Sequence, residues 1–292
     1  METKDMFKFG VDTFIWTENF TEKDLWVIEK AKEIGFEYMD FAIAHPDQFP
    51  VVKVIEHLSA TGIIPVTTTT LSKETNLISP DKAVRAAAVS HMKLMVDISV
   101  AIGAKITGGV NYAAWGYFTG KARSDAEWNY AVDAMREICA YAHSKDPELM
   151  ITVECINRFE THFLNVASDG VAFCRAVGTD NIKVHLDCFH MNIEESSFAD
   201  AIRTCGKEYL GYMHVNENNR GIPGTGMVPW YEVFTTLAEI GYTGPLVIES
   251  FDPNFEELVA NCAIWRKLAE SGEALAIAGL ENLQRLAAEA VK

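Results

Sequence analysis

Four acidic or imidazole side chains in this sequence each follow a short apolar run of the kind that forms a buried strand. In chain order they are Glu154 after 151–153, Asp187 after 182–186, His214 after 210–213 and Glu249 after 245–248. The intervals between them are 33, 27 and 35 residues. One strand–helix unit of an eight-fold barrel takes about 31 residues if roughly 250 residues are shared by eight units. We therefore expect the four side chains at the ends of four consecutive parallel strands, which meet at one face of a barrel.

The chemistry of this set of side chains favours a metal ion. Three carboxylates and one imidazole that converge in an apolar setting are costly unless a cation compensates them. Oxygen-rich ligand sets of this kind suit a hard divalent cation with open coordination positions. A salt bridge would explain any one of the four residues alone. Four residues in phase with the strand repeat indicate a shared site.

The rest of the chain supplies the elements that must position this site. Earlier strands are predicted near 7–14, 38–42, 63–68 and 105–109. Each predicted strand is followed by a helical pattern of apolar residues. The eight alternations predict an α/β fold, a (β/α)8 TIM barrel, with residues 1–292 as a single domain. A helical extension at about 273–291 would clamp the barrel or meet a partner subunit. A doubly wound open sheet is the alternative, but its ligands gather at a switch point and not at four neighbouring strands.

Several segments carry local predictions. Phe14 and Trp16, after the first strand, are expected to form an aromatic wall for a sugar-sized ligand. The aromatic segment 111–118, with Trp115, is interpreted as a lid or pocket wall. The threonine run 67–70 is interpreted as leaving its strand for a surface loop, and the alternative is that its hydroxyls face a ligand. After the eighth strand, one helix is predicted from Phe255 to about Gly272.

Capping residues mark the ends of two predicted helices. Thr21 with Asp24 approximates a capping box, and Gly35 ends the same helix. Ser124 and Asp125 begin another helix that runs to about His143.

Composition excludes several classes of function. The net charge of −16 and the pI near 4.9 argue against a nucleic-acid partner, which would require a basic patch. The six cysteines form no C-x-x-C motif and predict reduced core thiols of a cytoplasmic enzyme. The first residues lack the order of a signal peptide, and no run of 18 apolar residues predicts a membrane span.

Three segments around the four residues carry distinctive motifs. They are residues 154–160 (E-C-I-N-R-F-E), residues 186–195 (L-D-C-F-H-M-N-I-E-E), and His214 with Glu217 and Arg220. These segments resemble the E-x-x-N-R-F-E, L-D-T-F-H-M-N-I-E-E and H-x-x-E-x-x-R motifs of the ketose 3-epimerases. That group comprises the D-tagatose, D-allulose and L-ribulose 3-epimerases of the xylose isomerase-like barrels. The second segment departs from the motif at Cys188.

The resemblance implies a ligand set and a substrate. The implied metal ligands are Glu154, Asp187, His214 and Glu249. The ion is usually Mn²⁺, with Co²⁺ or Mg²⁺ as substitutes. Glu160, His190 and Arg220 would hold a ketose through its first three oxygens. The resemblance also implies a homodimer or a homotetramer. Phe14, Trp16 and Trp115 do not match the best-known members closely, so they leave the sugar open.

The implied reaction inverts carbon 3 of a free ketose, of the D-tagatose, D-fructose/D-allulose or L-ribulose type. It requires two bases on opposite faces of the sugar and a metal that stabilises the ene-diolate charge. Glu154 and Glu249 come from strands five and eight, so they are assigned as the catalytic pair. His190, placed in the loop after Asp187, is expected to donate a hydrogen bond to a substrate hydroxyl.

Related reactions remain as alternatives. An aldose–ketose isomerase of the same superfamily differs from a 3-epimerase only in which carbon of the sugar loses its proton. An epimerase of acidic sugars or inositol-type ketones is a further alternative. A zinc-dependent endonuclease would need additional histidines, and the fourth strand ends in glycines instead. A binding protein without catalysis would not require three carboxylates around a metal. His185 has the same strand parity as Asp187, so it points into the barrel either as a partner of the ligands or as a packed core histidine.

Overall fold

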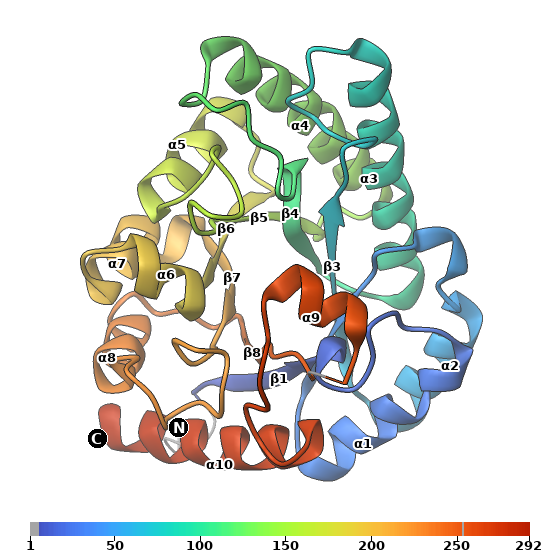
Figure 1. The fold of residues 1–292 in the computed structure, drawn as a ribbon. Coiled ribbons are helices and arrows are strands. Elements are labelled where there is room, and N and C mark those ends of the chain that lie inside the picture. Colours follow the sequence, from blue (N-terminus) through green and yellow to red (C-terminus); the bar gives the residue numbers. More distant parts are fainter. Residues whose placement is uncertain (1–5, 253) are drawn as a thin grey trace.

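Eight parallel strands form a closed barrel in sequence order (Figure 1). The computed structural model describes residues 6–252 and 254–292. The strands are β1 (Lys8–Asp12), β2 (Tyr38–Ala42), β3 (Ile64–Leu71), β4 (Ile106–Ala114), β5 (Met150–Glu154), β6 (Ile182–Asp187), β7 (Leu210–His214) and β8 (Pro245–Ile248). This arrangement confirms the predicted (β/α)8 fold class.

Helices surround the barrel and bury their apolar faces against it. They are α1 (Trp26–Ile34), α2 (Val51–Thr61), α3 (Lys82–Ile102), α4 (Asp125–Lys145), α5 (Ala167–Val177), α7 (Phe198–Tyr209), α8 (Trp230–Glu239) and α10 (Gly272–Ala290). Two short helices, α6 (Cys188–Glu194) and α9 (Glu256–Cys262), follow β6 and β8. The first loop contains the 3₁₀ turn η2 (Thr13–Ile15).

The predicted caps are present. The side chains of Thr21 and Asp24 form a capping box, although it opens a 3₁₀ turn and α1 begins only at Trp26. Gly35 ends α1 with φ of 109°, a left-handed conformation that favours glycine.

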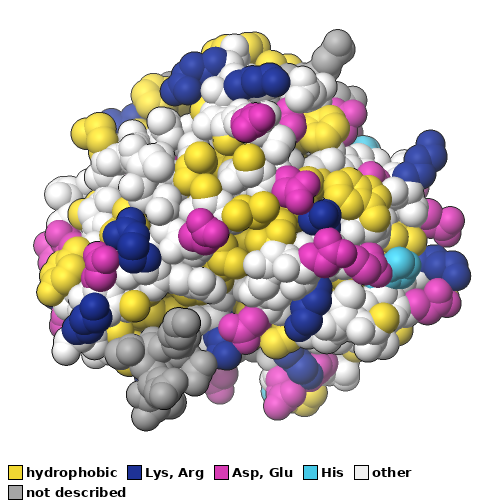
Figure 2. Space-filling model, turned by 90° about the horizontal axis from the view of Figure 1, so that it is seen from below, with side chains coloured by type: hydrophobic (Ala, Val, Ile, Leu, Met, Phe, Trp, Pro, Cys, Tyr) yellow, Lys and Arg dark blue, Asp and Glu magenta, His cyan; other side chains and the backbone are white. Residues whose placement is uncertain are grey.

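Helix α10 corresponds to the predicted C-terminal extension. Leu275, Leu280 and Leu283 are buried in the main core. On the face seen in Figure 2, which views the α10 side, apolar side chains are interspersed with charges of both signs. The packing of α10 against α8 and η2 supports the interpretation that it clamps the barrel.

The threonine run was wrongly predicted as a surface loop. Strand β3 continues to Leu71, and Thr67, Thr68 and Thr69 are buried. The Thr67 hydroxyl lies 2.6 Å from that of Ser99. The run remains a strand because β3 pairs on both sides, with β2 and β4.

Three other boundaries differ from the predictions. Strand β4 extends to Ala114, so half of the predicted aromatic loop is buried strand. His190 lies in helix α6 and not in a loop. The helix after β8 stops at Cys262, where Ala263 adopts a φ of 54° and turns the chain.

All six cysteines are free thiols, as predicted. Burial raises the pKa of the Cys155 and Cys188 thiols well above the usual value. These two residues directly follow two of the predicted ligands, Glu154 and Asp187. Among the helices of the described residues, none is both long and apolar enough to cross a bilayer.

Candidate active site

A cavity of about 480 Å³ opens at the carboxyl ends of the strands. Its wall includes Glu154, Glu160, His190, Arg220 and Glu249, which are five of the predicted site residues. Helix α9 lies in front of the barrel opening in Figure 1 and contributes Leu258, Asn261 and Cys262 to the wall. The cavity is therefore at the end of the barrel where the four strand-end residues were predicted to meet.

The imidazole of His214 lies between two carboxylates, one of which, Glu249, lines this cavity. Its Nδ1 is 3.8 Å from Oδ2 of Asp187 and 3.7 Å from Oε2 of Glu249. This nitrogen is buried and has no hydrogen-bond partner among the described residues. Burial disfavours an imidazolium, yet Glu249 and Asp187 raise the pKa of His214 well above its usual value. The surroundings thus favour a positive charge at this point.

Glu154 completes the group from the other side. Its Oε1 lies 3.7 Å from Nε2 of His190, which is in turn 3.8 Å from Oδ2 of Asp187. Burial raises the pKa of the Glu154 carboxyl well above the usual range. Donor atoms of Glu154, Asp187 and His190 all lie within 4.8 Å of one another, as do those of Asp12, His214 and Glu249. An unpartnered nitrogen among buried carboxylates fits a divalent cation.

A buried carboxylate behind His214 fixes the orientation of the ring. Asp40 Oδ2 lies 3.2 Å from His214 Nε2 and accepts a 2.6 Å hydrogen bond from the hydroxyl of Tyr212. Asp40 Oδ1 accepts a 2.9 Å bond from Thr68. With its Nε2–H directed at Asp40, His214 turns its other nitrogen, Nδ1, toward the cluster, where a cation would take the place of the Nδ1 proton.

Glu160, one of the predicted substrate-binding residues, is held by hydrogen bonds. Glu160 accepts 2.8 Å bonds from Trp115 Nε1 and Asn157 Nδ2. Although burial raises the pKa of Glu160, His190, Arg220 and the two donors together lower it below the usual value. Trp115 is therefore a hydrogen-bond donor as well as a wall.

Arg220 is held in one position by contacts on several sides. Its guanidinium lies 4.1 Å from the ring centroid of Phe189 and 4.7 Å from that of Phe251, and it forms a salt bridge with Glu249. The backbone of Arg220 has φ of 57°, which is unfavourable for a residue other than glycine. The hydroxyl of Ser250 donates to its carbonyl at 2.6 Å, so the surrounding contacts maintain this conformation.

The loop that carries Arg220 is organised by one buried carboxylate, Glu217. Its oxygens accept hydrogen bonds from the backbone N–H groups of Asn218, Gly224 and Val228. They also accept a 3.1 Å bond from the indole of Trp230. Burial raises the pKa of Glu217, but these donors lower it below the usual value.

We expect Glu217→Gln to lower the free energy of unfolding by about 2–3 kcal/mol, because an amide replaces an ion whose partners are all donors. Denaturant unfolding would measure this loss, with the exposed Glu208→Gln as the control. The folded pKa of Glu217 is depressed, so its contribution is present above about pH 4.3 and is lost as the pH falls through the folded value. The two proteins should therefore converge in stability in acid. Equal stability at pH 7 would contradict the role assigned to Glu217.

The two aromatic residues predicted to form a wall, Phe14 and Trp16, lie in different surroundings. Phe14 lines the cavity and lies 5.4 Å from the ring of Phe251. Trp16 instead packs against the main core and is absent from the cavity lining, so its predicted wall position is wrong. The 3₁₀ turn η2 begins at Thr13 and turns the chain away before Trp16.

Sequence reasoning missed three polar residues beside the cluster. Asp12 and Asp40 lie in β1 and β2 and are completely buried. Asn216, after β7, donates a 2.9 Å bond to Asp187 and accepts a 2.6 Å bond from the backbone N–H of Glu249. Asp12 and Asp40 are carboxylates in apolar strands, which is the same signal that identified the four predicted ligands.

The fold and the cavity define a class of enzymes. The sequence model of the family described as xylose isomerase-like TIM barrel matches residues 28–286, and the chain belongs to this family.

Its relatives narrow the class further. The chain is 34% identical to the D-psicose 3-epimerase of Agrobacterium fabrum, over 90% of this chain and 91% of that protein. It is 31% identical to the L-ribulose 3-epimerase of Mesorhizobium japonicum, over 93% of this chain and 91% of that protein. The crystal structure of a D-allulose 3-epimerase from Methylomonas sp. in complex with D-allulose superposes with a TM-score of 0.91 at 30% identity. It covers 96% of this chain and 97% of that chain. These similarities confirm the resemblance to ketose 3-epimerases and the assignment as an isomerase.

Proposed function

We propose that this protein is a metal-dependent ketose 3-epimerase that inverts carbon 3 of a free ketose. The observation that carries the proposal is the position of Glu154 and Glu249. Both line the cavity, yet Glu154 ends β5 and Glu249 follows β8, and two strands separate β5 from β8. The substrates in the names of the relatives, D-psicose, D-allulose and L-ribulose, are free ketoses and support this substrate class.

The proposed metal ligands are Glu154, Asp187, His214 and Glu249, with Mn²⁺ as the ion and Co²⁺ or Mg²⁺ as substitutes. When bound, the cation would supply Lewis-acid stabilisation of the negative charge that develops on the sugar oxygens. The cluster fits such an ion because Nδ1 of His214 is unpartnered and is oriented by Asp40.

Glu154 and Glu249 act as the acid–base pair. One carboxylate removes the proton from carbon 3, and the other returns a proton to the opposite face of the sugar. Arg220 contacts Glu249 directly and orients its carboxylate. The acid–base pair thus has one member tied to Arg220 and one beside His190.

His190 is the proposed hydrogen-bond donor to the substrate. Its Nδ1 accepts a 3.1 Å bond from the backbone N–H of Asn157. Burial lowers the pKa of His190, so the neutral ring carries its proton on Nε2, and the residue lines the cavity. Glu160 and Arg220, in the same wall, offer an acceptor and a donor to the neighbouring hydroxyl groups.

We expect Arg220→Lys to lower kcat/KM by about tenfold, because lysine cannot reproduce the planar contact with two rings and a carboxylate. Initial rates with the preferred ketose would measure this change. The exposed Arg203→Lys is the control and should retain wild-type kinetics. A value of kcat/KM for Arg220→Lys that equals the wild-type value would show that only the charge of Arg220 is required.

The products of one assay test the proposed function. Mn²⁺-loaded protein is incubated with D-fructose, D-tagatose and L-ribulose, and the products are resolved by chromatography. A 3-epimer of any of these ketoses supports the proposal. An aldose product would instead assign the protein to the sugar isomerases of the same superfamily.

A further inference from the structure

His185 is a buried imidazole that the proposed reaction does not use. It lies in β6, is fully inaccessible, and is absent from the lining of the cavity. Neither of its ring nitrogens has a hydrogen-bond partner among the described residues. A buried polar ring without partners is unfavourable, and it calls for an ion or a water molecule at that point.

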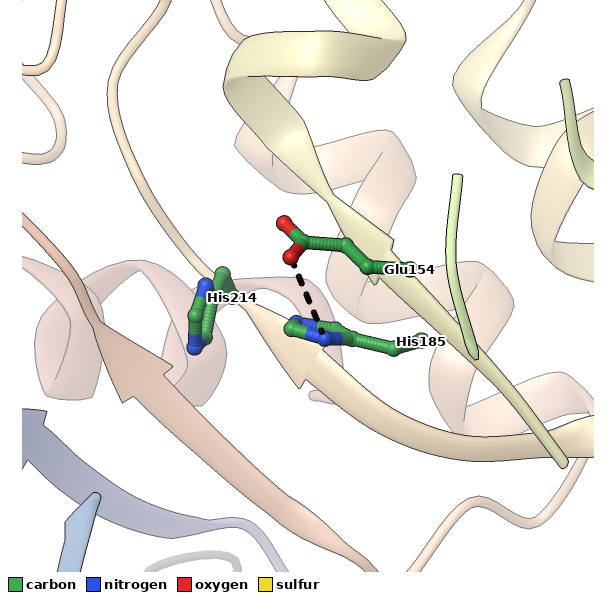
Figure 3. A group of neighbouring side chains, drawn as sticks. All are labelled: Glu154, His185 and His214. Atoms are coloured by element: carbon green, nitrogen blue, oxygen red, sulfur yellow. Dashed lines mark ion pairs between the residues drawn. The ribbon is translucent and has the colours of Figure 1, made fainter. Parts of the chain in front are cut away.

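Two further side chains point toward His185 (Figure 3). Its Nδ1 lies 3.8 Å from Oε2 of Glu154. The rings of His185 and His214 meet edge to face with centroids 4.3 Å apart. One donor atom from each of the three residues lies within 4.8 Å of the others. Three neighbouring strands, β5, β6 and β7, therefore place two imidazoles and a carboxylate around one buried point.

We propose that Glu154, His185 and His214 form a second, inner metal position that takes a borderline transition metal such as Zn²⁺. Imidazole nitrogens favour Zn²⁺, whereas carboxylate-rich sets favour Mn²⁺ and Mg²⁺. The inner position offers two nitrogens and one oxygen. The outer position, with Asp187 and Glu249, offers one nitrogen and three carboxylates, so the two positions differ in the ions that they select.

The two positions exclude one another. Both need Glu154 and the lone pair of His214, and a nitrogen lone pair binds one metal at a time. His185 precedes Asp187 by two residues and is absent from the cavity lining, whereas Glu249 is part of that lining. An ion held by His185 is therefore drawn deeper into the barrel, away from a sugar in the cavity. Zn²⁺ should therefore inhibit the enzyme, a consequence that rests on the proposed function.

Anomalous diffraction from crystals soaked in Zn²⁺ tests the position directly in the wild-type chain. We expect a zinc-edge peak between Glu154, His185 and His214. A single peak between Asp187 and Glu249, away from His185, would overturn the proposal. This measurement requires no variant, so it remains decisive even if a substitution of His185 prevents folding.

Metal affinities of a variant provide the second test. We expect His185→Leu to raise the Kd of Zn²⁺ roughly tenfold or more, and that of Mn²⁺ less than about threefold, in calorimetric titrations of the full chain. His91→Leu is the matched control because His91 is a partly buried imidazole that contacts Thr69 and lies outside the cluster. It should leave the Zn²⁺ affinity unchanged. Equal Zn²⁺ affinity of His185→Leu and wild type would overturn the proposal.

These readouts are independent of catalysis. If the protein bound Zn²⁺ at the inner position but yielded no 3-epimer with Mn²⁺, the inner position would stand and the proposed function would fall. If it yielded a 3-epimer but no zinc peak appeared beside His185, the function would stand and the inner position would fall.

Discussion

Glu249→Gln is expected to lower kcat by about a thousandfold, because a glutamine amide cannot accept or return the proton of carbon 3. Glu249 follows β8 at the wall of the cavity and lies 3.7 Å from the unpartnered nitrogen of His214. The variant should still bind Mn²⁺, although more weakly, since Glu154, Asp187 and His214 remain. The measurement is therefore made at saturating Mn²⁺.

Isotope exchange separates the role of Glu249 as a base from its role as a ligand. In deuterated water, the wild-type enzyme should incorporate deuterium at carbon 3 of the ketose, and Glu249→Gln should not. The exposed Glu239→Gln, which alters a carboxylate paired with Arg203, serves as the control and should exchange at the wild-type rate. Undiminished deuterium incorporation at carbon 3 in Glu249→Gln would rule out its assignment as a catalytic base.

The four proposed metal ligands could be predicted from the sequence because they lie at the ends of strands. Glu154, Asp187 and His214 are each the last residue of a strand, and Glu249 follows one directly. Such positions can be found by counting residues because the repeat of a parallel barrel is regular. The pairing of strands then brings the residues together, as Asp187 and His214 are in register between β6 and β7.

The parts that were missed depend on contacts between distant segments. Thr69 was predicted to lie in a surface loop, but it belongs to β3 and its hydroxyl donates a 2.8 Å hydrogen bond to the carbonyl of Ile43. Trp16 appeared to belong to a wall, but a 3₁₀ turn after β1 directs it to the core. Composition within a short window does not determine either outcome, because the neighbouring strands determine which side of the chain is buried.

Asp40→Asn is expected to weaken Mn²⁺ binding by about 10–100-fold, although Asp40 is not one of the proposed ligands. Its Oδ2 lies 3.2 Å from Nε2 of His214, and this contact keeps the proton on that nitrogen. An asparagine can turn its NH₂ group toward His214, which would favour the tautomer with the proton on Nδ1. That tautomer has no lone pair to offer to a metal. Titration of the protein with Mn²⁺, followed by electron paramagnetic resonance of the free ion, would measure the change in Kd.

Thr68→Val is the matched control for this substitution. It removes the 2.9 Å hydrogen bond to the other oxygen of Asp40 and leaves the contact with His214 in place. We expect the Kd of Thr68→Val for Mn²⁺ to stay within about threefold of the wild-type value. We also expect the kcat of Asp40→Asn to rise toward the wild-type value when Mn²⁺ is saturating. Equal losses of affinity in both variants would mean that the buried network acts through general stability. A wild-type Kd in Asp40→Asn would mean that the orientation of His214 is fixed by other contacts.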